Sequence, residues 1–194
     1  AAGDGRRWTS GLRRERARSY TRCVPAPAAV VFDNDGLTLD TEIVWTRGEV
    51  TLFARRGLEF TAEHKLELVG SAGPIAAAKL AAMLGAPPAD GMAILAELHA
   101  LVQQELELGC EPMPGAVALI EALRGAGTPI GLCSNSPRRF VDLALAGGGL
   151  AGAFATTLAA DDVERGKPDP EPYLAVCAAL GVAPERCVAL EDSP

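Results

Sequence analysis

Residues 30–42 read Val-Val-Phe-Asp-Asn-Asp-Gly-Leu-Thr-Leu-Asp-Thr-Glu, and this stretch decides the fold. A short apolar run that ends at Phe32 is followed by two aspartates, Asp33 and Asp35, and then by Gly36. Side chains alternate between the two faces of an extended strand, so both carboxylates leave the strand end on the same side. Such a pair needs a cation or a shared proton to offset its repulsion. The pattern therefore predicts a strand that delivers two acids to one edge of a sheet.

Two aspartates in this arrangement suit a nucleophile or metal ligand beside an acid/base whose pKa is shifted the other way. A simple turn is the alternative interpretation of an isolated Asp-x-Asp-Gly. A calcium loop of the EF-hand type is excluded, because Leu37 stands where that loop needs an acid or amide and Val44 stands where it needs glutamate. The apolar run before the motif favours a site at the carboxyl end of a parallel sheet.

The composition limits the possible partners. Of the 194 residues, 48% are hydrophobic and only 5% are aromatic, so Ala, Leu and Val must fill the core. No run approaches the roughly 18–20 apolar residues of a membrane span. Residues 1–22 carry seven arginines and two acids, a charge of +5, and since the whole chain carries −7, the rest carries −12. We therefore expect neither nucleic acid nor a membrane as a partner.

The two ends and the cysteines suggest a cytoplasmic protein that is not complete. Residues 1–22 have the composition of a transit peptide but lack the apolar segment of a secretory signal, and we expect a disordered extension. The chain stops at Pro194 directly after an acidic pair, and we expect a fragment truncated at this end. Zinc spacing is absent, because only two histidines accompany five scattered cysteines, Cys23, Cys110, Cys133, Cys177 and Cys187. A reducing, cytoplasmic compartment fits this usage best.

The pattern after the aspartates changes twice along the chain. Apolar residues at three- and four-residue spacing predict helices over 41–56, 61–69, 74–84 and 91–108. From Met113 onward, predicted strands at 128–133, near 154–158 and at 187–190 alternate with predicted helices at 115–125, 138–146 and 170–180. Alternating strands and helices imply right-handed crossovers and a parallel sheet. The sequence thus predicts an α/β fold: a doubly wound parallel core (23–45 and 113–194) with an inserted α-helical domain (46–112).

Polar residues follow the predicted strands one after another: Asp33 and Asp35, then Ser134 and Asn135, then Lys167, then Glu191 and Asp192. The carboxyl ends of strands in a doubly wound sheet share one edge. We therefore expect these side chains, which are distant in sequence, to converge on one crevice.

The four clusters resemble the haloacid dehalogenase superfamily of phosphohydrolases, in the branch with a helical cap inserted after the first motif. The resemblance covers about residues 28–194. It rests on Phe-Asp-x-Asp-Gly-x-x-x-Asp-Thr-Glu at 32–42, Cys-Ser-Asn-Ser at 133–136, Gly-Lys-Pro-Asp-Pro at 166–170 and Leu-Glu-Asp-Ser at 190–193. The subgroup to which the chain is most similar contains small-molecule phosphatases and β-phosphoglucomutases.

The resemblance implies roles for the acidic residues. Asp33 is implied to be the nucleophile that forms an aspartyl-phosphate, and Asp35 the acid/base. Mg²⁺ is implied to be held by the Asp33 carboxylate, the Asp35 backbone carbonyl and Asp192. Glu191 is implied to orient the site or to serve as an alternative ligand.

The resemblance also implies how the substrate is bound. Ser134 and Asn135 are implied to hydrogen-bond the phosphoryl oxygens, and Lys167 to neutralise the charge that develops on them. Substrate choice is expected to reside in the insert, residues 46–112, because every catalytic candidate lies outside it. Ser71 is the candidate specificity residue there, with an ordinary turn between helices as the alternative.

We expect a magnesium-dependent phosphatase that acts on a small phosphorylated metabolite, such as a sugar phosphate. Asp35 favours phosphoryl chemistry over dehalogenation, since a halide needs no proton to leave. A β-phosphoglucomutase-like phosphomutase would use the same two aspartates with a sugar hydroxyl, instead of water, as the acceptor. A non-catalytic fragment is the third hypothesis, and the oligomeric state is left open.

Overall fold

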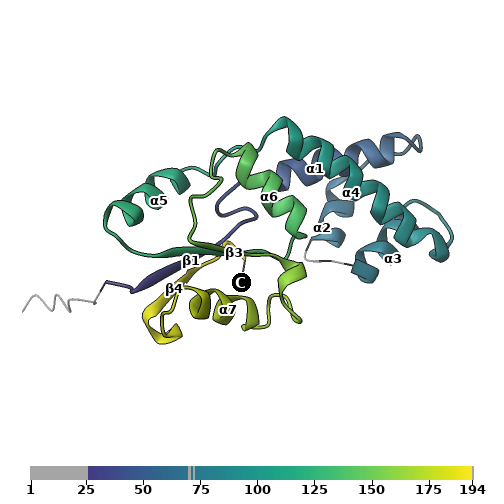
Figure 1. Cartoon of the computed structure of the whole chain (residues 1–194). Helices are drawn as coiled ribbons and strands as arrows, with labels where there is room; N and C mark the ends of the chain where they lie inside the picture. Colours follow the sequence, from purple (N-terminus) through teal and green to yellow (C-terminus); the bar gives the residue numbers. More distant parts are fainter. Residues whose placement is uncertain (1–25, 70, 72, 194) are drawn as a thin grey trace, which may run out of the picture.

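The computed structural model describes residues 26–69, 71 and 73–193. The basic segment 1–22, predicted to be a disordered extension, lies outside the described residues. Figure 1 shows a sheet with helices on both faces and a further group of helices beyond the carboxyl ends of its strands. The predicted fold class, an α/β parallel sheet with inserted helices, is confirmed.

Within the described part of the chain, four parallel strands form the sheet in the order β3-β2-β1-β4. They are β1 (Ala29–Asp33), β2 (Ile130–Cys133), β3 (Thr156–Leu158) and β4 (Cys187–Leu190). β1 is central and all of its residues are buried, which explains its uninterrupted apolar run. β2 starts two residues later than predicted, because Pro129 has no N–H to give to the ladder.

Three α-helices cover the two faces of the sheet (Figure 1). α5 (Ala116–Gly125) and α6 (Arg138–Gly147) lie on one face, and α7 (Glu171–Ala179) lies on the other. Single turns of 3-10 helix occur at Pro88–Asp90, Ala160–Asp162 and Pro184–Arg186. The sequence did not predict these turns, since an element of three residues has no periodicity to detect.

The segment between β1 and α5 contains α1 (Thr41–Ala54), α2 (Ala62–Leu68), α3 (Gly73–Met83) and α4 (Gly91–Leu108). Each of the four predicted helices is present, with bounds that agree to within two residues. α1 ends earlier than predicted because Gly57 takes a left-handed conformation, with φ of 70°, and the Leu58 N–H turns back to the carbonyl of Phe53. These four helices are called the helical insert below.

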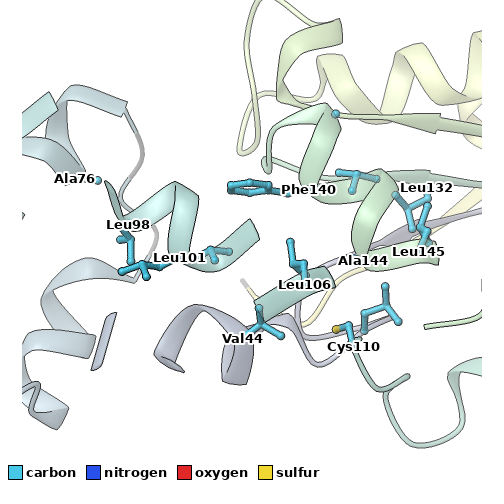
Figure 2. Packing of buried hydrophobic residues seen from close by; sticks show 14 of the residues in the cluster. Val44, Ala76, Leu98, Leu101, Leu106, Cys110, Leu132, Phe140, Ala144 and Leu145 are labelled. Carbon is cyan, nitrogen blue, oxygen red and sulfur yellow. The ribbon is translucent and has the colours of Figure 1, made fainter. Parts of the chain in front are cut away.

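One hydrophobic cluster joins the helical insert to the sheet (Figure 2). Leu98, Leu101 and Leu106 lie along one side of α4, at the spacing of an amphipathic helix. The cluster continues through Phe140 and Leu145 of α6 to the buried side chains of β1 and β2. The insert therefore shares its core with the α/β part through the contact between α4 and α6.

The described cysteines Cys110, Cys133, Cys177 and Cys187 are all free. Cys133 is fully buried and packs with Val31 and Val176 between the sheet and α7. It behaves there as a small hydrophobic residue. Across the described ranges, every helix is too short or too polar to cross a membrane.

Gly131, the second residue of β2, has no space for a side chain. A Cβ atom there would overlap Val176 of α7 and lie 3.1 Å from Thr156 of β3. We expect Gly131→Ala to push α7 away from the sheet and to lower the free energy of unfolding by about 1–3 kcal/mol. Urea denaturation followed by circular dichroism measures this change.

Gly125→Ala is the matched control, because a Cβ atom on Gly125 meets nothing within 4 Å and the residue ends α5 in ordinary helical geometry. Alanine is the better helix former, so this variant should be as stable as the parent or slightly more stable. Unchanged stability in Gly131→Ala would contradict a close contact between α7 and β2.

Candidate active site

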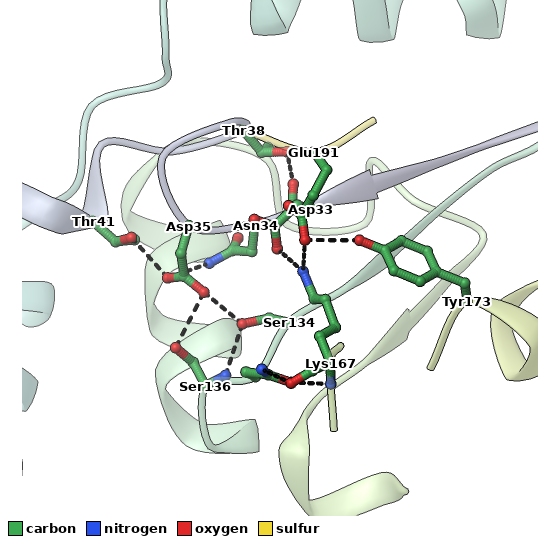
Figure 3. A network of polar contacts seen from close by, with 11 residues as sticks. Asp33, Asn34, Asp35, Thr38, Thr41, Ser134, Ser136, Lys167, Tyr173 and Glu191 are labelled. Carbon is green, nitrogen blue, oxygen red and sulfur yellow. Dashed lines mark hydrogen bonds and ion pairs between the residues drawn. The ribbon is translucent and has the colours of Figure 1, made fainter. Parts of the chain in front are cut away.

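The strand register brings the polar ends of three strands together. Asp33, the last residue of β1, is in register with Cys133, the last residue of β2. On the other side of β1, β4 ends at Leu190, which is in register with Phe32. The polar residues that follow each strand therefore meet at one edge of the sheet, where they form the network in Figure 3.

Four side chains donate hydrogen bonds to the carboxylate of Asp35. The hydroxyls of Ser134 and Ser136 donate to Oδ2, at 2.6 and 3.1 Å. The hydroxyl of Thr41 donates to Oδ1 at 2.7 Å, and Nδ2 of Asn34 donates to the same oxygen at 3.1 Å. The carboxylate is thus held in a single orientation from two sides (Figure 3).

Asp33 lies deeper, with a side chain that is 6% exposed. Nζ of Lys167 contacts its Oδ1, and the backbone N–H of Asn34 donates to the same oxygen at 2.7 Å. Burial, together with the neighbouring Glu191, raises the pKa of Asp33 to about 8, although the Lys167 ammonium opposes the rise. A divalent cation beside Asp33 would favour the ionised carboxylate at neutral pH.

Lys167 connects Asp33 to the residue that follows β4. Its Nζ lies 3.0 Å from Oε1 of Glu191, and the hydroxyl of Tyr173 donates to that same oxygen at 2.9 Å. Burial opposes a charge on Lys167, but the two carboxylates outweigh it and raise the pKa of the amine. Hydrogen bonds with Asp33, Lys167 and Tyr173 hold the pKa of Glu191 below its usual range despite partial burial. Lys167 is therefore a permanent cation in the site.

Asn135 holds the loop that carries Lys167. The backbone N–H of Lys167 donates to Oδ1 of Asn135 at 2.8 Å, and Nδ2 of Asn135 donates to the backbone carbonyl of Lys167 at 2.9 Å. Gly166 leaves space for this amide, since a Cβ atom there would lie 2.7 Å from Oδ1. Asn135 was predicted to contact phosphate. The hydrogen bonds found here are with the Lys167 loop, and the contact with phosphate stays a prediction.

Asp33, Glu191 and Asp192 form an acidic cluster, in which one oxygen from each residue lies within 4.8 Å of the others. Gly36, with φ of 79°, makes space for it, because a Cβ atom on Gly36 would overlap the Asp192 carboxylate. Oxygen ligands at such spacing suit a hard divalent cation. The acidic cluster could therefore hold a metal ion, and the further contribution of the Asp35 carbonyl stays a prediction.

The site brings together seven of the predicted residues: Asp33, Asp35, Ser134, Asn135, Lys167, Glu191 and Asp192. Ser71 belongs to the segment between α2 and α3 and, among the described residues, makes its hydrogen bonds outside this network. Its hydroxyl accepts a hydrogen bond from Nζ of Lys79 at 2.7 Å, which ties it to α3 within the helical insert. Its role in specificity is a prediction that these contacts leave open.

Sequence reasoning missed five residues of the network: Asn34, Thr38, Thr41, Ser136 and Tyr173. The first four lie within the motifs already quoted, so their position beside the aspartates and Ser134 was a usable signal. Tyr173 had no such signal. Only the packing of α7 under the sheet carries its hydroxyl to Glu191.

Similar proteins fall into one group of hydrolases and phosphatases. The family model described as haloacid dehalogenase-like hydrolase matches residues 27–194. Validoxylamine A 7'-phosphate phosphatase of Streptomyces hygroscopicus subsp. limoneus is 29% identical over 84% of this chain and 76% of that protein. Hexitol phosphatase B of Escherichia coli K12 is 30% identical over 85% of this chain and 75% of that protein. The crystal structure of CbbY from Rhodobacter sphaeroides in complex with phosphate is 26% identical, with a TM-score of 0.72 over 86% of this chain and 78% of that one.

Gly36→Ala tests the acidic cluster as a cation site. The added methyl group would displace the Asp192 carboxylate. We expect the Kd for a divalent cation to rise about tenfold, which corresponds to about 1.4 kcal/mol. Calorimetric titration of EDTA-treated protein with Mg²⁺ measures this affinity.

Gly57→Ala is the matched control for backbone strain. Gly57 has a similar left-handed conformation, with φ of 70°, but a Cβ atom there meets nothing within 4 Å. Both variants should therefore lose stability from the left-handed residue, by about 1–2 kcal/mol, whereas only Gly36→Ala should bind Mg²⁺ more weakly. Unchanged affinity in Gly36→Ala would argue against Asp192 as a ligand.

Proposed function

We propose a specific activity for this chain, which belongs to the haloacid dehalogenase-like hydrolases and is a phosphohydrolase. The chain hydrolyses the phosphate ester of a small metabolite, such as a sugar phosphate, with Mg²⁺ as cofactor and an aspartyl-phosphate as intermediate. The observation that supports this most is the pair Asp33 and Asp35, which leave one strand end into different surroundings. Two relatives are named as phosphatases of validoxylamine A 7'-phosphate and of hexitols, which favours a phosphorylated polyhydroxy substrate.

The two aspartates divide the chemistry. Asp33 attacks phosphorus through its carboxylate, the bond from phosphorus to the ester oxygen breaks, and the phosphoryl group stays on Asp33. Asp35 gives a proton to the departing oxygen in this step. Water then attacks phosphorus, Asp35 takes the proton from it, and the bond from phosphorus to Asp33 breaks to release phosphate.

Mg²⁺ would be held by the carboxylates of Asp33 and Asp192 and by the backbone carbonyl of Asp35, with Glu191 as orienter or alternative ligand. The spacing of the acidic cluster and the space beside Gly36 support this assignment. When bound, the ion acts as a Lewis acid that offsets the negative charge of the phosphoryl oxygens. Together with Lys167 it makes an otherwise acidic crevice acceptable to a phosphate.

The phosphoryl group would be bound by Ser134, Asn135 and Lys167. Ser134 has one hydroxyl hydrogen, which it donates to Asp35 and which would turn to a phosphoryl oxygen of a bound substrate. The ammonium of Lys167 lies against Oδ1 of Asp33, so it is placed to stabilise the charge that develops on a phosphoryl group beside this carboxylate.

The part of the helical insert within residues 46–112 would act as a cap, whose position controls which substrates reach the aspartates. It lies beyond the carboxyl ends of the strands (Figure 1), which is the edge that carries the site. Ser71 is the proposed specificity residue of this cap. The hydrogen bond from Nζ of Lys79 places a second polar group beside Ser71. Two neighbouring polar groups would suit the binding of a substrate that carries hydroxyl groups.

Replacing each aspartate with its amide tests the covalent mechanism. Asp33→Asn should abolish turnover, because an amide neither attacks phosphorus nor binds Mg²⁺ strongly. Asp35→Asn should keep its affinity for Mg²⁺, through the backbone carbonyl, but slow turnover by about 10²–10⁴. Phosphate release and Mg²⁺ titration on the same folded preparations measure both effects.

More than a few per cent of the parent rate in folded Asp33→Asn would rule out the covalent mechanism. A substrate panel of sugar and polyol phosphates, with and without a bisphosphate primer, separates hydrolysis from transfer to a sugar. Isomerised product that needs the primer, without release of phosphate, would favour the β-phosphoglucomutase-like alternative.

Ser71→Phe tests the cap as the source of specificity. A bulky side chain in this loop should change the relative kcat/KM values within the substrate panel, while phosphorylation of Asp33 by a minimal phosphoryl donor survives. Ala96→Phe is the control, since Ala96 is exposed on α4 beside Glu97, which pairs with the end of α1 far from Thr41. Equal loss on every substrate, or no effect at all, would identify the loop as an ordinary turn.

A further inference from the structure

Asn34 is a buried amide between the two aspartates, and its side chain is only half satisfied. The residue is 1% exposed. Its Nδ2 donates to Oδ1 of Asp35 at 3.1 Å, while its own Oδ1 has no hydrogen-bond partner among the described residues. A buried carbonyl oxygen without a partner makes the folded protein less stable than it would be with an apolar side chain of the same size at this position. The amide therefore needs an explanation other than stability.

The turn after β1 does not require an asparagine side chain. The backbone carbonyl of Asn34 accepts hydrogen bonds from the N–H groups of Thr38 and Leu39, at 3.1 and 3.0 Å, and its N–H donates to Asp33. Asparagine is often chosen for a left-handed conformation, but every positive φ in the described ranges belongs to glycine. An apolar residue could make the same backbone bonds.

The four donors to Asp35 differ in what they can accept. Thr41, Ser134 and Ser136 donate through hydroxyls, which can rotate and accept a hydrogen bond instead. The amide nitrogen of Asn34 can only donate. The hydrogen bond from Asn34 therefore has a fixed direction: it holds Oδ1 of Asp35 on the side of the amide and leaves Oδ2 facing the hydroxyls of Ser134 and Ser136 (Figure 3).

We propose that Asn34 is a positioning residue that holds Oδ1 of Asp35 and so keeps Oδ2, the oxygen beside Ser134, turned toward the reacting group. This inference rests on the acid/base role of Asp35 in the proposed function. In the first step Asp33 bonds to phosphorus, the ester bond breaks, and the proton on Oδ2 goes to the ester oxygen. In the second step a water oxygen bonds to phosphorus, the bond to Asp33 breaks, and a proton of that water returns to Oδ2. Oδ2 is the oxygen that Ser134 shares, on the side where the phosphoryl group is proposed to bind.

Two variants separate the loss of the donor from a change in stability. Asn34→Leu fills the space and removes the unpaired carbonyl, so its Tm should rise. Asn34→Ala leaves a cavity, so its Tm should fall. Both variants lack the amide donor. If Asn34 positions the carboxylate of Asp35, their kinetic defect should be the same although their stabilities change in opposite directions.

The kinetic readout is kcat/KM for p-nitrophenyl phosphate and for phenyl phosphate at saturating Mg²⁺. The acidic p-nitrophenol leaves readily as its anion, whereas phenol leaves more slowly and depends more on a proton donor. We expect both variants to lose about tenfold more activity on phenyl phosphate than on p-nitrophenyl phosphate. Equal loss on the two substrates, or a loss that follows Tm, would overturn the positioning role.

Asp35→Asn is the reference in the same assay, because it removes the proton donor itself. If it discriminates between the two substrates and the Asn34 variants do not, the inference on Asn34 fails and the proposed function stands. If Asp35→Asn shows no discrimination, the acid role in the proposed function fails, and the inference on Asn34 fails with it.

Discussion

Three carboxylates, those of Asp33, Glu191 and Asp192, each place an oxygen within 4.8 Å of the others, and their repulsion constrains everything around them. Like charges repel more strongly in a partly buried site than in water, so the fold must supply positive charge at this edge of the sheet. Lys167 supplies one cation in direct contact with two of the carboxylates. The neutral amide of Asn135 contributes by holding the backbone of Lys167 in place through two hydrogen bonds. A divalent cation would complete the compensation.

The same strand end also separates two acids that are one residue apart. Asp33 is buried against Lys167, and its surroundings consist of charges. Asp35 instead receives hydrogen bonds from four neutral side chains, and its surroundings consist of dipoles. A charge beside a buried carboxylate governs whether it is ionised, whereas hydroxyl and amide donors govern where it points. A nucleophile needs the first kind of control and an acid/base the second, so sequence neighbours acquire different chemistry from the elements that fold around them.

The sequence carried most of the fold and part of the site, for physical reasons that differ between residues. Two rules predicted that Ser134, Lys167 and Glu191 lie beside the two aspartates. Side chains alternate along a strand, which puts Asp33 and Asp35 on one side, and parallel strands end at one edge of the sheet. Helix bounds were predictable wherever apolar spacing and glycine agreed, as at α4. Contacts that depend on how helices pack were not. The hydroxyl of Tyr173 reaches Glu191 only because α7 lies under the sheet, and no pattern around Tyr173 indicates that placement.

Two contacts lead from the helical insert to the carboxylate of Asp35. Thr41 is the first residue of α1 and also donates to Asp35, so the orientation of the first insert helix and that of the carboxylate are coupled. α4 packs on α6, and α6 begins two residues after Ser136, which donates to the other oxygen of Asp35. These two contacts therefore lead from the insert to the same carboxylate. A displacement of α1 relative to the sheet would change the hydrogen bond from Thr41, whereas Asn34 belongs to the turn directly after β1.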